Sequence, residues 1–528
     1  MPGASRGLFE IDSPQRHEGH RECTKTSQSS FFPLCRLGVL RAFVVNNQVM
    51  ANYDFDIAVI GAGTGGLVAS FLAASLGART ALIEREKMGG ECLWTGCVPS
   101  KTLLKSARVY DTIKRAEEFG VHVEKPRLVW GAVRMRIAAV RDEIKDLERE
   151  EMQRSGIEFI NGDASFEDAH TLRIAGKSGE RVVRAKRFIL ATGTRARVPD
   201  LEGLGDAGFI THEQIFDLPN LPRSLVILGG GPIAVELAQA FQRFGSRVTI
   251  VQKADRLMTR EDPEISAACR RLLEQEGVEI HLGATAKRAG EDDEGKFLEF
   301  ATSDGASRTV HGSQLLIAVG KAVDVSGLNL EAAGVAVDGN GVVVDDHLHT
   351  TAPHIWACGD VTGKFLFTHI AEYQGKIAAQ NALLPVKASA DYRVVPWTTF
   401  TDPEISHLGL TEEEARREHG SCRVYRTPFN KLDRAIIEGE TEGFLKVVTT
   451  GSGRIVGAHI IGPSAGELIH TFVPAVRDGT LIQELAETIH VYPTLSEIGH
   501  RAGNEYYREL LESKPVQWVL NVVKPEHR

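Results

Sequence analysis

Two glycine-rich segments constrain the fold of this chain more than any other feature of its 528 residues. The first, Gly61-Ala-Gly-Thr-Gly-Gly66, follows the apolar run Phe55–Ile60 and precedes an Ala- and Leu-rich stretch that ends near Leu76. The second, Gly229-Gly-Gly-Pro-Ile-Ala234, follows the apolar run Ser224–Leu228 in the same way. A buried strand, a tight glycine turn and a helix, in this order, begin a dinucleotide-binding unit. The chain is therefore predicted to contain two such units.

In the first unit, each glycine has its own physical task. Gly61 permits the tight turn, Gly63 lets the backbone approach a pyrophosphate, and Gly66 lets the helix pack closely on the strand. Gly65 stands in the first turn of that helix, where free N–H groups and the positive end of the dipole bind phosphates. Glu84 ends the next predicted strand, and its carboxylate can accept hydrogen bonds from a ribose diol.

The second unit fits the variant of the motif that ends in alanine, with Gly229, Gly231 and Ala234 in the three places. Its second strand ends in Gln252 instead of an acid, and Lys253 and Arg256 lie just beyond. Loss of the acid removes repulsion of a 2′-phosphate, and the two cations attract one, so the sequence favours NADPH over NADH. The alternative is that Lys253 and Arg256 are ordinary solvated charges.

Composition limits the class of protein further. Apolar residues make up 42% and charged residues 25% of the chain, which is enough for a large core. Lys and Arg total 61 against 70 Asp and Glu, a formal charge of −9, which gives no support to binding of nucleic acid or an anionic membrane. Because no apolar run reaches 18 residues, we expect no membrane span and a cytoplasmic protein.

A pair of cysteines lies between the two units, in Gly89-Gly-Glu-Cys92-Leu-Trp-Thr-Gly-Cys97-Val-Pro-Ser-Lys101. On a regular helix, two residues at this spacing are about 7.5 Å apart along the axis, which is too far to bond. Gly96 and Pro99 can distort the turn and bring Cys92 to Cys97, which predicts a labile redox disulfide. A helix that starts near Pro99 would lower the pKa of the Cys97 thiol. No Cys or His pair with matching spacing stands nearby, so we predict no metal site.

The order of these motifs, followed by Ala357-Cys-Gly-Asp360, resembles the flavin-dependent pyridine nucleotide–disulfide oxidoreductases from residue 54 to about residue 515. The resemblance implies an α/β fold with two Rossmann-like dinucleotide-binding domains and a C-terminal α+β dimerisation domain. The implied domains are an FAD-binding domain (51–195 and 321–388), an NAD(P)-binding domain (196–320) and a dimerisation domain (389–528).

Residues 1–50 differ in composition from the rest, since they are rich in Ser, Arg, His and Gln and show no clear hydrophobic period. They are either a targeting segment or the product of an upstream start, with Met50 as the natural first residue. We favour the upstream start and expect disorder before residue 50.

The resemblance also implies roles for single residues. FAD would bind the first unit, with Glu84 on its ribose and Asp360 on its ribityl or phosphate chain. Cys97 would be the charge-transfer thiolate nearest the flavin, and Cys92 the thiol that meets the substrate. Lys101 would lie near the flavin N5 and pair with Glu236. The further cofactor-binding residues that the resemblance implies are Gly90, Ala191, Thr192, Gly193, Gly320, Gly359 and His369, the last through a backbone or flavin-edge contact.

The C-terminal motif separates the branches of this family. The segment GCVPSK resembles the dihydrolipoamide dehydrogenases and mercuric reductases, and the disulfide reductases carry His directly before a Pro, with Glu five residues after the His. Here Tyr492 stands before the Pro, Glu497 is in register, and His490 lies two residues early. Tyrosine, with a pKa near 10, is a poor base at neutral pH, which argues against dihydrolipoamide turnover. Mercuric reductases carry Tyr at this place.

Other local features depart from these relatives. No CxxC metal-binding segment precedes the first unit and no vicinal cysteines stand near the C-terminus, so the chain is mercuric-reductase-like. The run Val319-Gly-Lys-Ala-Val-Asp324 replaces the usual Gly-Arg-x-Pro-Asn, which we interpret as a reshaped turn.

The sequence therefore predicts a homodimeric FAD enzyme that passes electrons from NAD(P)H through the flavin and a Cys92–Cys97 disulfide to an electrophile. The candidate acceptors are a metal ion, a quinone or a small disulfide. One alternative is a dihydrolipoamide dehydrogenase that uses NAD, with His490 in place of the usual base. Another is a non-catalytic flavin-binding module, against which the cysteine pair, Lys101 and Glu236 argue.

Overall fold

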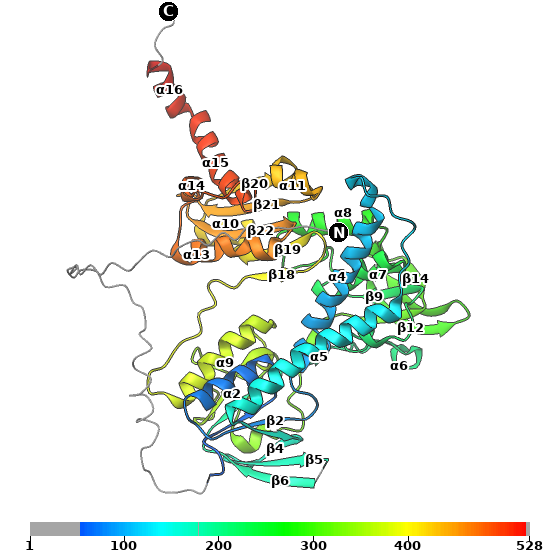
Figure 1. The fold of residues 1–528 in the computed structure, drawn as a ribbon, viewed down its shortest axis with the longest axis vertical. Helices are drawn as coiled ribbons and strands as arrows, with labels where there is room; N and C mark the ends of the chain where they lie inside the picture. The colour runs from blue at the N-terminus through cyan, green and yellow to red at the C-terminus, as the bar shows by residue number, and fades with distance from the viewer. Residues whose placement is uncertain (1–52, 178, 524–528) are drawn as a thin grey trace, which may run out of the picture. The chain divides into compact units, whose positions relative to one another are not determined.

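The computed structural model describes residues 53–177 and 179–523, and the prediction for residues 1–50 lies outside them. Five parallel strands form the first sheet (Figure 1). Along the chain these are β1 (Ile57–Ile60), β2 (Thr80–Glu84), β3 (Glu158–Asn161), β7 (Phe188–Leu190) and β17 (Ile355–Ala357), in the spatial order β17-β7-β1-β2-β3. The associated helices are α2 (Thr64–Ser75), α5 (Trp130–Ser155) and α9 (Thr368–Leu383), and an antiparallel sheet of β4 (Asp163–Asp168), β5 (Thr171–Gly176) and β6 (Gly179–Arg184) follows β3.

The second sheet repeats this plan. Its parallel strands are β9 (Ser224–Leu228), β10 (Arg247–Val251), β11 (Glu279–His281) and β15 (Gln314–Ile317), in the order β11-β10-β9-β15. The helices are α6 (Leu204–Ala207), α7 (Pro232–Phe244) and α8 (Pro263–Gln275), with an antiparallel sheet of β12 (Thr285–Asp292), β13 (Gly295–Ala301) and β14 (Ser307–Gly312). A two-stranded ribbon of β8 (Thr194–Ala196) and β16 (Lys321–Val323) joins the chain on either side of this unit.

The C-terminal part is built on an antiparallel sheet in the order β18-β19-β22-β21-β20. Its strands are β18 (Trp397–Thr399), β19 (Glu404–Gly409), β20 (Cys422–Pro428), β21 (Phe444–Thr450) and β22 (Ile455–Gly462). Its helices are α10 (Glu412–His419), α11 (Asp433–Glu438), α12 (Ala465–Leu468), α13 (Phe472–Asp478), α14 (Ile482–Glu487), α15 (Glu497–Glu512) and α16 (Lys514–Val523). The two parallel sheets and this α+β part confirm the predicted fold class.

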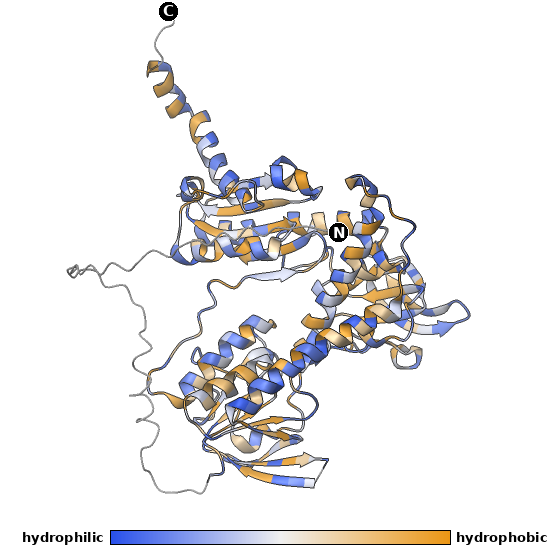
Figure 2. Ribbon diagram, viewed as in Figure 1, coloured by the Kyte–Doolittle hydropathy of each residue, from blue (hydrophilic) through white to orange (hydrophobic). Residues whose placement is uncertain are grey.

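The apolar runs Phe55–Ile60 and Ser224–Leu228 contain β1 and β9, since a parallel sheet covered by helices buries both faces of each strand. All four residues of β1 are buried, as expected of a parallel strand that is covered on both faces. Apolar residues, orange in Figure 2, accordingly run through the strands. The charged residues 102–155 have a helical period, which predicts helix throughout, but residues 115–129 interrupt it. There Gly120 takes a left-handed φ of 72°, and Pro126 follows, so a helix cannot continue.

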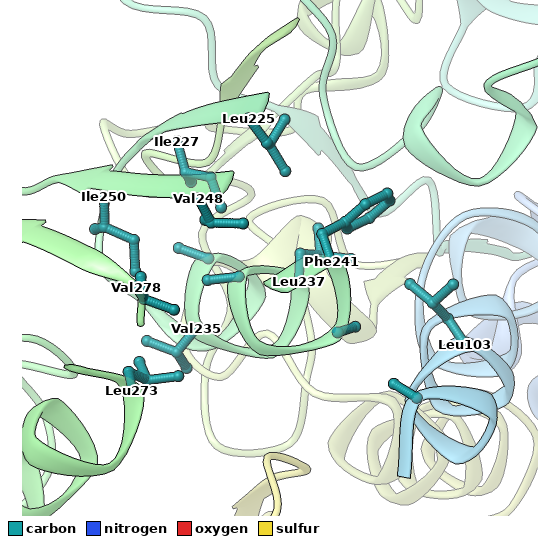
Figure 3. Close-up of a cluster of buried hydrophobic side chains, with 14 of the residues drawn as sticks. Leu103, Leu225, Ile227, Val235, Leu237, Phe241, Val248, Ile250, Leu273 and Val278 are labelled. Atoms are coloured by element: carbon teal, nitrogen blue, oxygen red, sulfur yellow. The ribbon is translucent and has the colours of Figure 1, made fainter. Parts of the chain in front are cut away.

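Helix α4 (Cys97–Lys114) packs against α7 through one large apolar cluster. Figure 3 shows Leu103 of α4 beside α7, where Val235, Leu237 and Phe241 meet the side chains of β9 and β10. Leu103 and Phe241 are fully buried. This packing fixes the two helices relative to each other, and it thereby fixes the polar groups that α4 and α7 carry.

Among the helices of the described segments, none is both long and apolar enough to cross a membrane.

A buried ion pair joins α8 to the C-terminal sheet. Lys446 of β21 is 2% exposed and donates to both carboxylate oxygens of Asp262, at 2.9 and 3.0 Å. Asp262 is fully buried and also caps α8 through the Glu264 N–H. The Lys446 ammonium is 2.9 Å from the carboxylate of Glu412 as well.

We expect Lys446→Met to lower the free energy of unfolding by about 3 kcal/mol, because it leaves buried carboxylates without a cation. Urea unfolding followed by tryptophan fluorescence measures this. The control is Lys145→Met, which breaks an exposed pair with Asp142 and should leave the free energy of unfolding nearly unchanged. Equal losses for the two variants would contradict the account.

Candidate active site

The two glycine turns have the same local construction. Gly61 has φ +102° and Gly229 has φ +119°, both in the region that favours glycine. A Cβ on Gly61 would overlap the carbonyl of Ala191, and a Cβ on Gly229 would overlap that of Ala318. In each unit, this carbonyl belongs to the residue that directly follows the neighbouring parallel strand, β7 in the first unit and β15 in the second. Each turn is therefore closed against the sheet and leaves the start of its helix open to a ligand.

The first turn has the features of a pyrophosphate cradle. The backbones of Gly63 and Gly90 face each other, since a Cβ on Gly90 would lie 2.7 Å from the Gly63 Cα. The carboxylate of Glu84 accepts the Ala62 N–H at 2.8 Å, which holds the end of β2 against the turn. The Thr192 hydroxyl is buried without a hydrogen-bond partner in the described part of the chain. A glycine cradle, a carboxylate at the strand end and an unsatisfied hydroxyl together fit the phosphates and ribose of FAD.

The second turn differs in its charges. Gly231 has no heavy atom within 4 Å of a built Cβ, so its face is open, whereas Ala234 is fully buried under the helix. Gln252 ends β10 and its amide donates to the Arg256 carbonyl at 3.4 Å. Lys253 is exposed beside them. The strand end thus carries no acid that would repel a 2′-phosphate.

The two active-site cysteines lie on different helices. Cys92 belongs to α3 (Gly90–Trp94), and Cys97 is the first residue of α4, two residues earlier than the predicted start near Pro99. Gly96 separates the helices with φ −107° and ψ −113°, a conformation outside the helical region. This break places the two thiols close enough for each to shift the pKa of the other. No disulfide joins Cys92 to Cys97 in the structure.

The surroundings favour a thiolate at Cys97. A hydrogen bond from the Cys92 thiol lowers the pKa of Cys97, and this outweighs burial. The Thr368 hydroxyl, 3.4 Å from the Cys97 sulfur, and the charges of Lys101 and Lys321 lower the same pKa further. The same contact with Cys97 raises the pKa of Cys92. The pair therefore has one nucleophilic thiolate and one protonated thiol, and the start of α4 adds its dipole at the thiolate.

The predicted ion pair on the other side of α4 is present. Lys101 donates to both carboxylate oxygens of Glu236, at 2.9 and 3.0 Å. The Phe400 N–H donates to the same carboxylate at 2.8 Å, and the Phe400 ring lies 4.6 Å below the ammonium. Because Glu236 is 5% exposed, Lys101 is held in one direction by a nearly buried anion.

The predicted C-terminal site residues make their contacts within the C-terminal part of the chain and not with the cysteine pair. The Tyr492 hydroxyl donates to Asp433 at 2.8 Å, and this hydrogen bond raises the pKa of Tyr492. Tyr492 is nonetheless 65% exposed. The His490 ring contacts the Thr488 carbonyl at 2.9 Å. The Glu497 carboxylate accepts a long hydrogen bond of 3.4 Å from the Thr494 N–H. Within the described residues of one chain, these three side chains form no hydrogen bond with either cysteine.

The remaining predicted cofactor residues lie beside β8, beside β16, after β17 and at the start of α9. Gly193 and Gly320 have positive φ and no heavy atom within 4 Å of a built Cβ, so their faces are open. Gly359 also has a positive φ, and Asp360 beside it accepts the Thr194 hydroxyl at 3.2 Å. His369 contacts the Pro396 backbone, and burial lowers its pKa.

Sequence reasoning missed four residues near the dithiol: Glu91, His212, Lys321 and Thr368. Glu91 directly precedes Cys92, and its carboxylate is 2.8 Å from the His212 ring and 2.8 Å from the Lys321 ammonium. The run that contains Lys321 was predicted only to reshape a turn, which is incomplete, because Lys321 also lies 3.6 Å from Asp360. The one available signal was that Glu91 and Lys321 are charged residues beside predicted cofactor-binding motifs.

No group of three or more His, Cys, Asp or Glu side chains within residues 53–177 and 179–523 is arranged to hold a metal ion.

Comparison with known proteins gives a consistent result. Residues 55–375 match the family model described as pyridine nucleotide-disulphide oxidoreductase, and residues 395–502 match its dimerisation domain. A mercuric reductase from Bacillus cereus is 34% identical over 84% of this chain and 70% of its own length. A dihydrolipoyl dehydrogenase from Geobacillus stearothermophilus is 33% identical over 85% of this chain and 96% of its own length.

Among solved structures, the Cu(II) complex of the HOCl-induced flavoprotein disulfide reductase RclA from Escherichia coli superposes with a TM-score of 0.78. The two sequences are 30% identical, and the match covers 85% of this chain and 99% of the RclA chain.

We expect the Cys97 thiol to react with iodoacetamide at pH values well below the ordinary thiol pKa of about 8.5, because the thiolate is the reactive form. Thr368→Val removes the hydroxyl that contacts the sulfur, so the midpoint of the rate-against-pH curve should rise by about 0.5–1 unit. The matched control is Thr112→Val on α4, the helix that carries Cys97, where the Thr112 hydroxyl donates to the Arg108 carbonyl. An unchanged midpoint in Thr368→Val would contradict this role.

Proposed function

Because this chain belongs to the pyridine nucleotide-disulphide oxidoreductase family, we propose that it reduces a thiol-binding metal ion, such as Hg(II) or Cu(II), with electrons from NAD(P)H. Membership confirms the predicted family, an FAD-dependent enzyme, and the cofactors FAD and NAD(P)H. The metal ion as acceptor, the roles of single residues and the domain division given above are part of the proposal.

When bound, FAD supplies the means to take a hydride from the nicotinamide and to pass an electron pair to a disulfide. The cysteine pair accepts these two electrons when its S–S bond breaks, which yields the Cys97 thiolate and, with one proton, the Cys92 thiol. The dithiol then returns to the disulfide as the acceptor is reduced. The overall balance is NAD(P)H + Hg²⁺ → NAD(P)⁺ + H⁺ + Hg⁰, or two Cu²⁺ reduced to two Cu⁺ for the same electron pair.

One observation carries the choice of acceptor. Dihydrolipoamide must lose thiol protons, which requires a base, and the residue in the base's place is Tyr492. Its hydroxyl already donates to Asp433, and its raised pKa leaves even less of the side chain deprotonated at neutral pH than in free tyrosine. A metal ion brings no proton to remove. It needs a thiolate ligand, which the electrostatics of Cys97 favour.

The names of the relatives support the same choice. Mercuric reductases are among the most similar curated proteins, and the superposed RclA structure is a Cu(II) complex. Dihydrolipoyl dehydrogenases are similarly close, which keeps that activity as the second candidate.

The proposed enzyme is a homodimer, because the C-terminal part matches a dimerisation domain. Ile489, Val491 and Tyr492 are 98%, 76% and 65% exposed in the single chain. We place Tyr492 and Glu497 of one protomer opposite the Cys92 thiol of its partner. For the nicotinamide cofactor we propose NADPH, on the strength of Gln252 and the exposed Lys253.

The decisive measurement compares two reactions of the FAD-loaded enzyme. The first is oxidation of NADPH by Hg(II) or Cu(II) in the presence of excess thiol. The second is reduction of NAD⁺ by dihydrolipoamide near pH 8. We expect metal-dependent turnover and a rate at least about 10²-fold lower with dihydrolipoamide, the smaller end of what a general base contributes. Cys92→Ser and Cys97→Ser should each abolish metal reduction while the yellow flavin is retained. Fast dihydrolipoamide turnover would replace this proposal with the dehydrogenase.

A gain of function tests the role assigned to Tyr492. Tyr492→His restores a base with a pKa near 6.5 at the position where the disulfide reductases carry one. We expect dihydrolipoamide turnover to rise by about 10²-fold. His490→Gln should leave it unchanged. Loss of this low activity in His490→Gln would instead assign the base's role to His490.

A further inference from the structure

The last helix of the described chain carries a continuous apolar surface that is exposed to solvent. Helix α16 contains no buried residue. Its large apolar side chains that are between 37% and 69% exposed are Trp518, Val519, Leu520, Val522 and Val523. Leu510 and Leu511, at the end of α15, are exposed as well. We call residues 510–523 the C-terminal arm. A contiguous exposed apolar surface of this kind marks an interaction site.

The order of residues in α16 separates an apolar face from a polar one. The apolar stripe follows the spacing i, i+3, i+4 and i+7 and consists of Val516, Val519, Leu520 and Val523. Trp518 and Val522, which are four residues apart, widen this stripe on one side. The opposite, polar face consists of Lys514, Gln517 and Asn521.

A side-chain hydrogen bond ties the polar face of α16 to α15. Ser513 lies between the two helices with φ −66° and ψ 140°, which is outside the helical region, so α16 is a separate helix. The Gln517 amide then donates to the Leu511 carbonyl at 2.6 Å. Because the polar face makes this contact with the same chain, the apolar face is left for another molecule.

Helix α16 needs such a contact for its own stability. It has only 10 residues, and four of them are β-branched valines. Helices shorter than about 12–15 residues are marginal in water, and β-branched side chains lose rotamer freedom in a helix. The stability of α16 must therefore come from packing of its apolar face.

The place of the arm in the chain indicates what covers it. The match to the dimerisation domain ends at residue 502, within α15 (Glu497–Glu512), and the same helix continues into the arm. The arm is thus a direct extension of the part of the chain that matches a dimerisation domain. A membrane surface fits less well, because the arm carries only the charges of Glu512 and Lys514. Helices that lie on membranes have a strongly charged polar face.

We propose that the C-terminal arm packs its apolar face on the partner subunit and forms a second contact beyond the dimerisation domain. In a dimer with two-fold symmetry, this contact occurs twice, once for each arm. Trp518 is the anchor, since a large aromatic side chain at the centre of a contact contributes most to binding. The contact rests on the proposed homodimer and is independent of the electron acceptor.

Photo-crosslinking tests the contact directly. The photoreactive residue p-benzoylphenylalanine replaces Trp518 in the full-length, FAD-loaded protein. Illumination should join two chains, which gives a product of twice the mass of one chain, and mass spectrometry of the joined peptides locates the contact on the partner. The same replacement of Asn521, on the polar face, is the matched control and should give little of this product. A crosslink that forms only within one chain would overturn the proposal.

Subunit exchange gives a quantitative second test. Two pools of the protein, labelled with different fluorophores, are mixed, and the gain of energy transfer reports the rate of dissociation. Trp518→Glu places a charge in the apolar contact, so exchange should become at least about tenfold faster. Asn521→Glu adds the same charge to the polar face and should change the rate by about twofold or less. A chain that ends at Ser513 lacks α16 and should exchange at least as fast as Trp518→Glu.

The remaining outcomes separate this contact from the other proposals. Equal exchange rates for Trp518→Glu and Asn521→Glu in a stable dimer would keep the homodimer and reject the arm, whereas a monomeric protein would reject both. Flotation of the original protein, but not of Trp518→Glu, with phosphatidylglycerol vesicles would assign the apolar face to a membrane and overturn the proposal. Crosslinked chains and faster exchange of Trp518→Glu in a protein that fails to reduce metal ions would uphold the contact and reject the proposed acceptor.

Discussion

The interruption of one helix at Gly96 is the constraint on which the rest of the site depends. A continuous helix would place Cys92 and Cys97 too far apart along its axis to react with each other. With the break, α3 ends at Trp94 and α4 begins at Cys97, so the two thiols meet and the sulfur of Cys97 lies at the positive end of an 18-residue helix. The same helix, one turn later, carries Lys101 to Glu236. Packing of α4 on α7 then determines where both charged groups stand.

The two nucleotide-binding units could be predicted from the sequence because their determinants are local. Each needs a short apolar strand, a turn that only glycine can make and a helix, all within about 30 residues. The strand predicted to end at Glu84 is β2, which does end there, and the glycine positions lie where the turns are. The Lys101–Glu236 pair was accessible only through the resemblance to a family, since its two members are far apart in the chain.

What could not be predicted depends on contacts between distant segments. Glu91, His212 and Lys321 belong to three stretches with no common motif, and only the pairing of β16 with β8 brings the last of them to the dithiol. Residue spacing gives no information on such a meeting. The start of α4 was predicted two residues late for a related reason. Pro99 is a common signal for a helix start, but here the chain enters the helix as soon as Gly96 permits it.

The charges around the dithiol also explain why a tyrosine can stand where related enzymes place a histidine base. A base is needed when a substrate thiol must lose its proton before it can attack a disulfide. In this chain the acidity resides in the enzyme's own Cys97, whose pKa is lowered by the Cys92 thiol, Thr368 and two lysines. An acceptor that binds directly to a thiolate then requires no proton transfer from the partner subunit. Under the proposed function, the position before Pro493 has no acid–base role, and a hydroxyl that bonds Asp433 is compatible with it. The low pKa of Cys97 at the start of α4 and the tyrosine at position 492 are therefore consistent with one proposal, in which the acceptor delivers no proton to the enzyme.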